Sequence, residues 1–251
     1  MEKLQRKIAL ITGVSSERDM GTAICRKLAS QGIDIFFTHW NSSKEWPDRF
    51  VAELSELGVQ SASLEIDLST AQAAREVLDT VSKQIGFPSI LINNAAHSTR
   101  DGYLKLDAKT LEDHYAVNMR TTFLLSVEFA RRFTKSKVHS GRIINMTSGQ
   151  DLGPMPNELA YVATKGAISA FTRTLAAEVG SIGITVNAVD PGPTDSTWMT
   201  DEIRKWLLPR FPMGRIGLPE DAASLIGFLA SEDGKWITGQ VIHSNGGFNL
   251  G

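Results

Sequence analysis

The stretch that decides the fold is K-I-A-L-I-T-G-V-S-S-E-R-D-M-G at residues 7–21. Its first five residues form a short, continuous apolar run, as expected of a strand that is covered on both faces of a sheet. Thr12 and Gly13 end that run, and from Gly21 onward apolar residues recur at helical spacing. A strand, a glycine-containing turn and a helix in this order predict a dinucleotide site, because a helix N-terminus offers unpaired N–H groups and a positive dipole to a pyrophosphate.

The turn itself departs from the usual G-x-G-x-x-G spacing, because the mostly polar residues 14–20 separate Gly13 from Gly21. On this motif alone, a plain strand-to-helix loop is an equally good interpretation. Within the loop, Ser15, Ser16 and Arg18 are the candidates for contacts with the phosphates of a dinucleotide.

Strand and helix patterns alternate along the rest of the chain. Near-continuously apolar strands that alternate with helices predict an α/β fold, a Rossmann-type doubly wound parallel sheet of about seven strands with helices on both faces. No linker, repeat or low-complexity segment divides it, so we expect a single domain over residues 1–251. The further strand patterns lie at 33–38, 61–66, 90–92, 141–145, 184–189 and 240–243, and the further helix patterns at 47–57, 70–84, 111–133, 159–179 and 222–229.

Composition excludes several classes of function. The 251 residues carry a net charge of −2, with a pI of about 6.2, which offers no electrostatic case for binding nucleic acid or an anionic membrane. The single Cys25 excludes an internal disulfide and forms no metal-ligand spacing with the five scattered histidines, so no metal is expected. Residues 1–7 do not resemble a signal peptide, and no apolar run reaches ~18 residues, so we expect a cytoplasmic protein.

The residues after the second strand pattern bear on the choice of cofactor. An acidic residue at this point holds the adenosine ribose 2′-OH in NAD-binding proteins. Here residues 38–44 read T-H-W-N-S-S-K, and no carboxylate comes before Glu45. Hydroxyls, His39 and Lys44 suit a 2′-phosphate better, and Arg18 is expected to add a second positive charge. The sequence therefore favours NADP(H) over NAD(H), although these residues can also be ordinary loop residues.

Tyr161 and Lys165 lie four apart at the start of the helix pattern 159–179, so they share one helix face. A Lys ammonium near a phenol favours the phenolate, which is expected to lower the pKa of Tyr161 from ~10 toward the working pH. Such a phenol can exchange a proton with a carbonyl/alcohol pair. Taken alone, the pair also fits an amphipathic helix with one aromatic residue and one solvated Lys.

Further motifs follow in a fixed order along the chain. In this order and spacing they resemble a classical short-chain dehydrogenase/reductase over nearly the whole chain, closest to the 3-oxoacyl-(acyl-carrier-protein) reductase-like group. The motifs are Thr12-Gly13, Asp67, Asn93-Asn94-Ala95, Asn118, Ser148, Tyr161, Lys165 and Pro191-Gly192.

The resemblance implies a catalytic set. Tyr161 would protonate the carbonyl oxygen as hydride arrives, and Ser148 would hydrogen-bond the same oxygen. Lys165 would lower the pKa of Tyr161 and bind the nicotinamide ribose, while Asn118 would hold a water that links Lys165 to solvent. Taken alone, Ser148 can also be a residue that forms a turn at the end of a strand. Asn118 can also be a polar residue that hydrogen-bonds within its helix.

The resemblance also implies a set of cofactor contacts, distributed from the pyrophosphate to the adenine and the nicotinamide carboxamide. They are Gly13 and Gly21 at the pyrophosphate, Asp67 and Leu68 at the adenine, Asn93 and Ala95 at the adenosine ribose, and Pro191, Gly192, Thr194 and Ser196 near the carboxamide.

Three features depart from the family pattern. The long glycine loop looks more like that of bacterial enoyl-(acyl-carrier-protein) reductases, but those enzymes use Y-x6-K spacing and this chain has Y-x3-K. Ala96, followed by His97, replaces the usual glycine after Asn-Asn-Ala, and Asn245 stands where aspartate is common. We give more weight to the Y-x3-K spacing of Tyr161 and Lys165 than to the loop, and therefore favour the classical group over the enoyl reductases.

Residues 193–213 are the expected substrate lid, since they follow Pro191-Gly192 and their apolar content suits an acyl or otherwise hydrophobic substrate. Core packing explains any one of these residues equally well. Residues 151–159 would form the other wall of the pocket. Family analogy implies a homotetramer that pairs residues 112–130 and 171–179.

The expected function is that of an NADP-dependent carbonyl reductase or alcohol dehydrogenase acting on a small molecule, with a 3-oxoacyl thioester of fatty acid biosynthesis as the candidate substrate. Two alternatives stay open at this point. One is an NAD-dependent alcohol or sugar dehydrogenase, and the other is a non-catalytic dinucleotide-binding regulator.

Overall fold

The computed structural model describes residues 6–249, so the two ends of the predicted domain, 1–5 and 250–251, lie outside the described residues. Seven parallel strands form one sheet in the order β3-β2-β1-β4-β5-β6-β7. This arrangement confirms the predicted fold class. The strands are β1 (Ile8–Ile11), β2 (Asp34–His39), β3 (Ser61–Glu65), β4 (Ile90–Asn93), β5 (Gly141–Met146), β6 (Ile184–Asp190) and β7 (Val241–His243).

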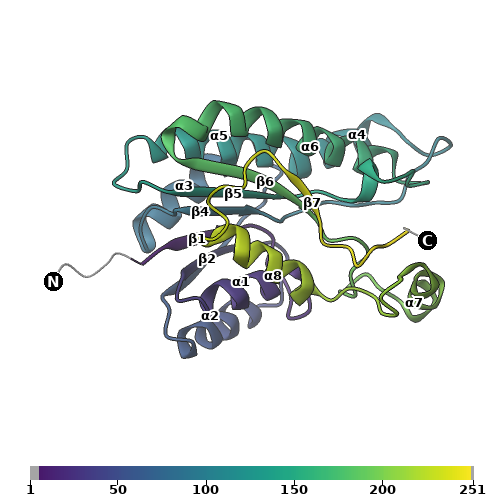
Figure 1. Ribbon diagram of the computed structural model, residues 1–251, viewed down its shortest axis with the longest axis horizontal. Coiled ribbons are helices and arrows are strands. Elements are labelled where there is room, and N and C mark those ends of the chain that lie inside the picture. Colours follow the sequence, from purple (N-terminus) through teal and green to yellow (C-terminus); the bar gives the residue numbers. More distant parts are fainter. Residues whose placement is uncertain (1–5, 250–251) are drawn as a thin grey trace.

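Helices cover both faces of the sheet. Figure 1 shows α1, α2 and α8 on one face and α3, α5 and α6 on the other, with α7 standing away from the sheet. The neighbours Phe36 and Phe37 of β2 are both fully buried, and each belongs to a different hydrophobic core. Successive side chains of a strand point to opposite faces, which explains the continuous apolar runs. The helices are α1 (Met20–Ala29), α2 (Trp46–Glu56), α3 (Ala73–Gln84), α4 (Ala108–His114), α5 (Thr122–Phe133), α6 (Leu159–Val179), α7 (Asp201–Leu207) and α8 (Pro219–Ala230).

The predicted helix at 111–133 is not one regular helix. A π-helical segment, Tyr115–Thr121, separates α4 from α5. Short π-helical insertions change the hydrogen-bond register from four to five residues and often occur at functional sites. The hydrophobic pattern predicts a helix through this region but does not reveal the change of register.

The strand order reverses between β1 and β4, and ligands of such sheets bind outside the carboxyl ends of the strands near that point. The ends of β1, β4, β5 and β6 bring Gly13, Ala95, Ser148 and Pro191 to the same edge. Four motifs that are far apart in the sequence are thereby collected in one region.

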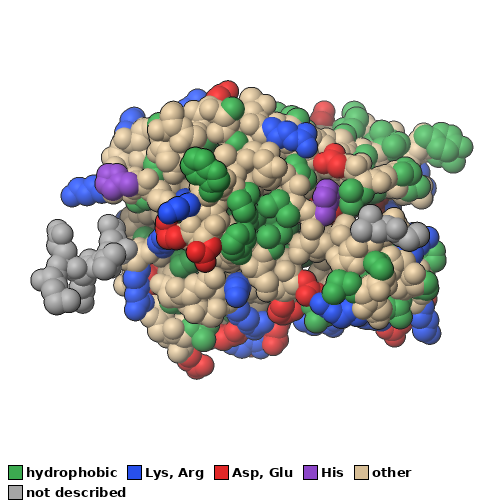
Figure 2. Space-filling view, viewed as in Figure 1, with side chains coloured by type: hydrophobic (Ala, Val, Ile, Leu, Met, Phe, Trp, Pro, Cys, Tyr) green, Lys and Arg blue, Asp and Glu red, His purple; other side chains and the backbone are tan. Residues whose placement is uncertain are grey.

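Charged side chains of both signs lie close together on the face shown in Figure 2. Within residues 6–249, no helix is long and apolar enough to cross a bilayer. The same residues contain no group of three or more His, Cys, Asp or Glu side chains placed to hold a metal ion.

Candidate active site

Helix α6 presents Tyr161 and Lys165 one turn apart. The Lys165 Nζ lies 5.4 Å from the centroid of the Tyr161 ring and donates a 2.8 Å hydrogen bond to the carbonyl of Met146, the last residue of β5. Burial lowers the pKa of Lys165 to about 8. The ammonium, the aromatic ring and the strand end therefore form one packed unit.

The pKa of Tyr161 does not move in the predicted direction. Burial raises the pKa of Tyr161 to about 12, interaction with the Ser148 hydroxyl lowers it, and the carboxylates of Glu158 and Asp190 raise it further. The prediction that Lys165 brings this pKa toward working pH is therefore wrong for the residues of the chain alone. Loss of solvent around the phenolate outweighs the Ser148 hydrogen bond, so Tyr161 is held as a neutral phenol that can donate its proton.

Asp101 fixes the N-terminus of α6. Its carboxylate accepts hydrogen bonds from the N–H groups of Leu159 and Ala160, at 2.7 and 2.8 Å, and from that of Gly102. Burial alone would raise the pKa of Asp101, but these backbone donors hold it below its ordinary value. An N-terminal carboxylate satisfies orphan helix donors and complements the helix dipole. The turn that carries Tyr161 is thus held from outside its own helix.

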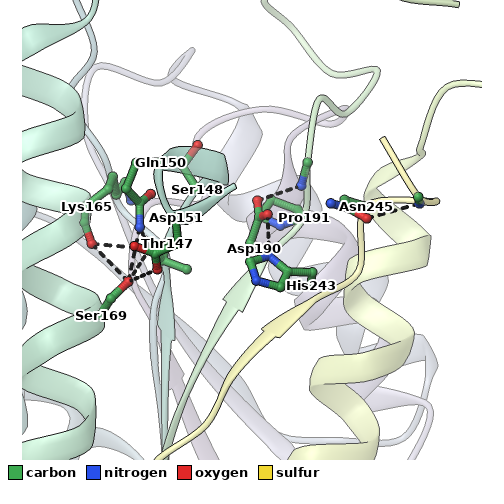
Figure 3. Close-up of polar contacts among 12 residues, drawn as sticks. Thr147, Ser148, Gln150, Asp151, Lys165, Ser169, Asp190, Pro191, His243 and Asn245 are labelled. Atoms are coloured by element: carbon green, nitrogen blue, oxygen red, sulfur yellow. Dashed lines mark hydrogen bonds and ion pairs between the residues drawn. The ribbon is translucent and has the colours of Figure 1, made fainter. Parts of the chain in front are cut away.

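Ser148 lies between β5 and a short 3₁₀ helix, Gly149–Asp151. The side-chain amide of Gln150 donates 3.1 Å hydrogen bonds to the hydroxyls of Thr147 and Ser169 (Figure 3). These bonds join the 3₁₀ helix to α6 on either side of Ser148. The position of the Ser148 hydroxyl beside Tyr161 is therefore set by contacts of its neighbours.

Asn118 lies in the π-helical segment, and its side chain is buried. Its Oδ1 accepts from the N–H of His97 at 2.6 Å, while its Nδ2 donates to the carbonyl of His97 at 2.9 Å and to the Thr164 hydroxyl at 3.1 Å. The side chain thus ties the segment after β4 to α6. These bonds use both N–H groups of the amide and one lone pair of its oxygen, so the side chain is fixed in place. The water that Asn118 is expected to hold stays a prediction.

The glycine turn is packed directly against the segment after β4. Gly13 has a φ of +74°, and a Cβ at this position would lie 2.6 Å from the Cα of Ala95, so no larger residue fits. The Asn94 Nδ2 donates to the carbonyls of Thr12 and Gly13 at 2.9 and 2.8 Å. At Gly21 a Cβ would lie 2.7 Å from the Gly13 carbonyl oxygen. Both predicted glycines therefore allow a close backbone approach.

The two serines of the loop do not present free N–H groups. The N–H groups of Ser15 and Ser16 each donate a 2.8 Å hydrogen bond to Oδ2 of Asp19, and Oδ1 of Asp19 caps α1 by accepting from Thr22. The expected contacts of Ser15 and Ser16 with the phosphates stay a prediction, and in this loop conformation their N–H groups are not available for them. The carboxylate of Asp19 already satisfies both donors.

Arg18 is not placed beside the predicted 2′-phosphate pocket. Its guanidinium lies 3.6 Å from a carboxylate oxygen of Asp195, which follows Thr194 on the far side of the predicted cofactor site. Asp195 also forms an ion pair with Arg204 of α7. In this arrangement Arg18 faces Asp195, and the second positive charge that it was expected to add near His39 stays a prediction.

His39 ends β2 and is buried, with its Nδ1 2.9 Å from the Ser42 hydroxyl. Burial lowers the pKa of His39, and Glu65 on the neighbouring strand raises it less strongly. The imidazole is therefore neutral at pH 7. In the 38–44 stretch, the exposed Lys44 carries the positive charge that remains for a 2′-phosphate.

The predicted adenosine contacts are only partly available. Asp67 Oδ1 accepts from the N–H of Ser69, and the Leu68 carbonyl accepts from a hydroxyl of the π-helical segment. Asn93 is different, since its Nδ2 donates to the Ser126 hydroxyl at 2.9 Å and to Asn145 Oδ1 at 2.8 Å. The Asn93 side chain joins β4 to α5 and β5, so it is not available to the adenosine ribose. Only the backbone of Asn93 can make the predicted ribose contact.

The loop after β6 is folded on itself. The Thr194 hydroxyl donates to the Gly192 carbonyl at 3.2 Å, and the N–H of Ser196 donates to the Thr194 carbonyl. Thr194 is buried, whereas Pro191, Gly192 and Ser196 are half-buried at the edge of the sheet. The backbone of this loop is therefore the part that remains accessible to a ligand.

The expected lid, 193–213, has two kinds of apolar residue. Met199, Leu207 and Phe211 form a small core of their own with Ile216. The others face solvent: Trp206 is 60% exposed and its ring packs on the Arg210 guanidinium, 3.7 Å from the ring centroid. The further exposed residues are Trp198, Leu208 and Met213.

Comparison with known proteins agrees with this geometry. A family model described as enoyl-(acyl carrier protein) reductase matches residues 13–249. The uncharacterized oxidoreductase YjdA of Bacillus subtilis is 67% identical over 251 residues, which is 100% of both chains. The 3-oxoacyl-[acyl-carrier-protein] reductase FabG of Pseudomonas aeruginosa is 38% identical, over 98% of this chain and 99% of the relative. A solved short-chain dehydrogenase/reductase from Serratia marcescens superposes with a TM-score of 0.89 at 30% identity, over 98% and 99% of the two chains. The chain belongs to the short-chain dehydrogenase/reductase family.

As a short-chain dehydrogenase/reductase, the protein is an NAD(P)-dependent oxidoreductase, which removes the alternative of a non-catalytic regulator. The family model is described as enoyl-(acyl carrier protein) reductase, the group of enzymes whose glycine loop resembles the long loop of this chain. The active-site spacing does not follow that name, because Tyr161 and Lys165 are one helical turn apart and Ser148 lies beside them.

Three residues of this short-chain dehydrogenase/reductase were not among the predicted site residues. Asn94 stands inside a quoted motif, and Asp19 directly precedes a helix pattern, so the capping preference of Asp could have identified it. Asp101 gives no local signal, because the helix that it caps begins far along the chain.

Proposed function

We propose that this short-chain dehydrogenase/reductase is an NADP-dependent carbonyl reductase that converts a 3-oxoacyl thioester into the 3-hydroxyacyl form. The observation that carries the proposal is the packed unit of Tyr161, Lys165 and Ser148, joined through Thr164 to Asn118. The FabG relative, identical at 38% of positions, supports the choice of substrate class.

Reduced NADP, when bound, supplies the hydride for the carbonyl carbon. Tyr161 is half-buried, stands as a neutral phenol and donates its proton to the carbonyl oxygen, which Ser148 holds by a second hydrogen bond. The Lys165 ammonium, 5.4 Å from the ring centroid, then stabilises the phenolate that remains. We propose that a proton then returns to Tyr161 through Lys165 and the water that Asn118 is predicted to hold.

The donor set fits a dinucleotide at the carboxyl edge of the sheet. The absence of a side chain at Gly13 and Gly21 keeps the turn before α1 narrow, and Arg18 points across this region toward Asp195. We assign Arg18 to the pyrophosphate and Asp67 to the adenine. Lys44 is assigned to the 2′-phosphate, which supports NADP(H).

The substrate pocket is proposed to lie between the 151–159 loop and the lid at 193–213. The exposed Trp198, Trp206 and Met213 offer an apolar surface to an acyl chain, while the small core around Phe211 keeps the lid folded. Closure of this lid would exclude water from the carbonyl.

One observation favours a second candidate, an NAD-dependent alcohol or sugar dehydrogenase. Glu65 lies beside His39 at the end of β2, and a carboxylate there disfavours a 2′-phosphate. Comparison of initial rates with NADPH and NADH, using a short 3-oxoacyl thioester as acceptor, distinguishes the two. Equal or better use of NADH would favour the second candidate.

We further propose a homotetramer. Phe123 of α5 and Phe171 of α6 stack with ring centroids 3.9 Å apart, and the neighbouring Leu124 is 44% exposed, so α5 and α6 present a paired helical surface. Sedimentation of the purified protein tests this assembly. A cytoplasmic location and a place in fatty acid biosynthesis stay predictions.

A further inference from the structure

Asp190 ends β6 immediately before the Pro191-Gly192 turn, and its carboxylate is fully buried. One oxygen accepts a 2.9 Å hydrogen bond from the N–H of Gly192, and the other lies 2.8 Å from Nδ1 of His243 (Figure 3). A buried carboxylate is costly unless it is paired and hydrogen-bonded. Both of its oxygens have such a partner, so this pair is a built feature of the site edge.

The carboxylate of Asp190 is close to the proposed reaction centre. A Cβ added to Gly149, the residue after Ser148, would lie 4.0 Å from the same oxygen that meets His243. The negative charge of Asp190 also raises the pKa of Tyr161, so its field reaches the phenol. Asp190 therefore lies beneath the space between Ser148 and the Pro191-Gly192 turn.

His243 brings the C-terminal part of the chain into the same arrangement. It lies on β7 in register with Asp190, and the N–H of Ser244 donates to the Asp190 carbonyl at 2.8 Å. Gly192 packs so closely on Asn245 that an added Cβ would lie 2.5 Å from the Asn245 Cβ. The turn after β6 is thus held from below by Asp190 and from the side by the segment after β7.

We propose that Asp190, held by His243, is a positioning residue of the cofactor site whose charge favours the oxidised dinucleotide over the reduced one. The oxidised nicotinamide carries a positive charge that the reduced ring lacks. A fixed carboxylate in a poorly solvated site acts on that charge more strongly than it would in water. The inference rests on the proposed function in one respect, that the nicotinamide lies between Tyr161 and the turn after β6.

The test is the ratio of dissociation constants for NADP⁺ and NADPH, measured by calorimetric titration without substrate. Asp190→Asn keeps the size of the side chain and an acceptor for Gly192 but removes the charge. We expect this variant to weaken the binding of NADP⁺ relative to that of NADPH by about five- to tenfold. Asp190→Ser is a second charge-free variant for the case that the first does not fold. His243→Asn is the matched control, because it retains a donor for Asp190, and its ratio should stay within about twofold of the wild type.

A charge-free variant that binds both forms with an unchanged ratio overturns the proposal. An equal shift in His243→Asn also overturns it, because the effect would then come from displacement of the turn. Neither measurement involves turnover of a carbonyl substrate. The rate assay with the thioester therefore tests the substrate class, and the ratio of dissociation constants separately tests the role of Asp190.

Discussion

The carboxylate of Asp101 accepts a 2.8 Å hydrogen bond from the N–H of Ala160, the residue directly before Tyr161. The bond joins the loop after β4 to the first turn of α6. Asn118 makes a parallel connection, since it bonds both the backbone of His97 in that loop and Thr164 of α6. The phenol is therefore positioned by two links that come from outside its helix.

Replacement of Asp101 by Ala should destabilise the protein by about 1–2 kcal/mol, the usual effect of losing a helix cap. It should also lower kcat, since Tyr161 stands in the turn that the cap fixes. Urea unfolding and steady-state rates measure the two effects. Asp101→Asn is the control, because it keeps one acceptor and should show a smaller loss of both. Unchanged stability and rate in the Ala variant would show that the cap has no such role.

The lowered pKa of Lys165 gives a prediction for stability against pH. Since the folded value is about 8 and the ordinary value 10.5, the unfolded chain binds more protons between these pH values. The free energy of unfolding should therefore rise with pH in this window, by about 2 kcal/mol from pH 8 to 9.5. Lys165→Met should lack this rise. Equal pH dependence of wild type and variant would mean that Lys165 keeps its ordinary pKa when folded.

Arg18→Gln should weaken the binding of NADPH and of NADH to a similar extent, about three- to tenfold, because the pyrophosphate is common to both cofactors. Dissociation constants from fluorescence titration measure the effect. Arg49→Gln is a matched control, since Arg49 pairs with Glu17 of the same loop and is 65% exposed. A loss confined to NADPH would instead place Arg18 at the 2′-phosphate.

Asn41→Asp tests the proposed preference for NADP(H). The change is isosteric, and Asn41 has a φ of +51°, a conformation that Asp tolerates. A carboxylate just after β2 should repel the 2′-phosphate, so the ratio of kcat/KM for NADPH to that for NADH should fall about tenfold. If the ratio does not change, the 2′-phosphate does not lie at this loop.

The parts of the fold that depend on hydrophobic periodicity were predictable from the sequence. The pattern at 159–179 coincides with α6, and the strand patterns fall within one residue or two of the observed strands. The π-helical segment around Asn118 was not predictable, because a change of hydrogen-bond register leaves the apolar pattern nearly unchanged.

The features of the site that the sequence did not reveal depend on partners distant in the sequence. Arg18 is drawn to Asp195, and the side chain of Asn93 is used by Ser126 and Asn145. The pKa of Tyr161 follows its burial, which no spacing between Tyr161 and Lys165 reveals. Motif order identifies the residues of such a site, but their charge states depend on the packing around them.

The most direct test of the proposed function is oxidation of NADPH and NADH by the purified protein with a short 3-oxoacyl thioester, compared with Tyr161→Phe. We expect faster oxidation of NADPH by the wild type, and a loss of about 10²- to 10⁴-fold in kcat for the variant. The variant should bind NADPH nearly as tightly as the wild type, because the phenol proton acts on the carbonyl oxygen. A variant that keeps most of the wild-type rate would contradict the assignment of Tyr161 as the proton donor.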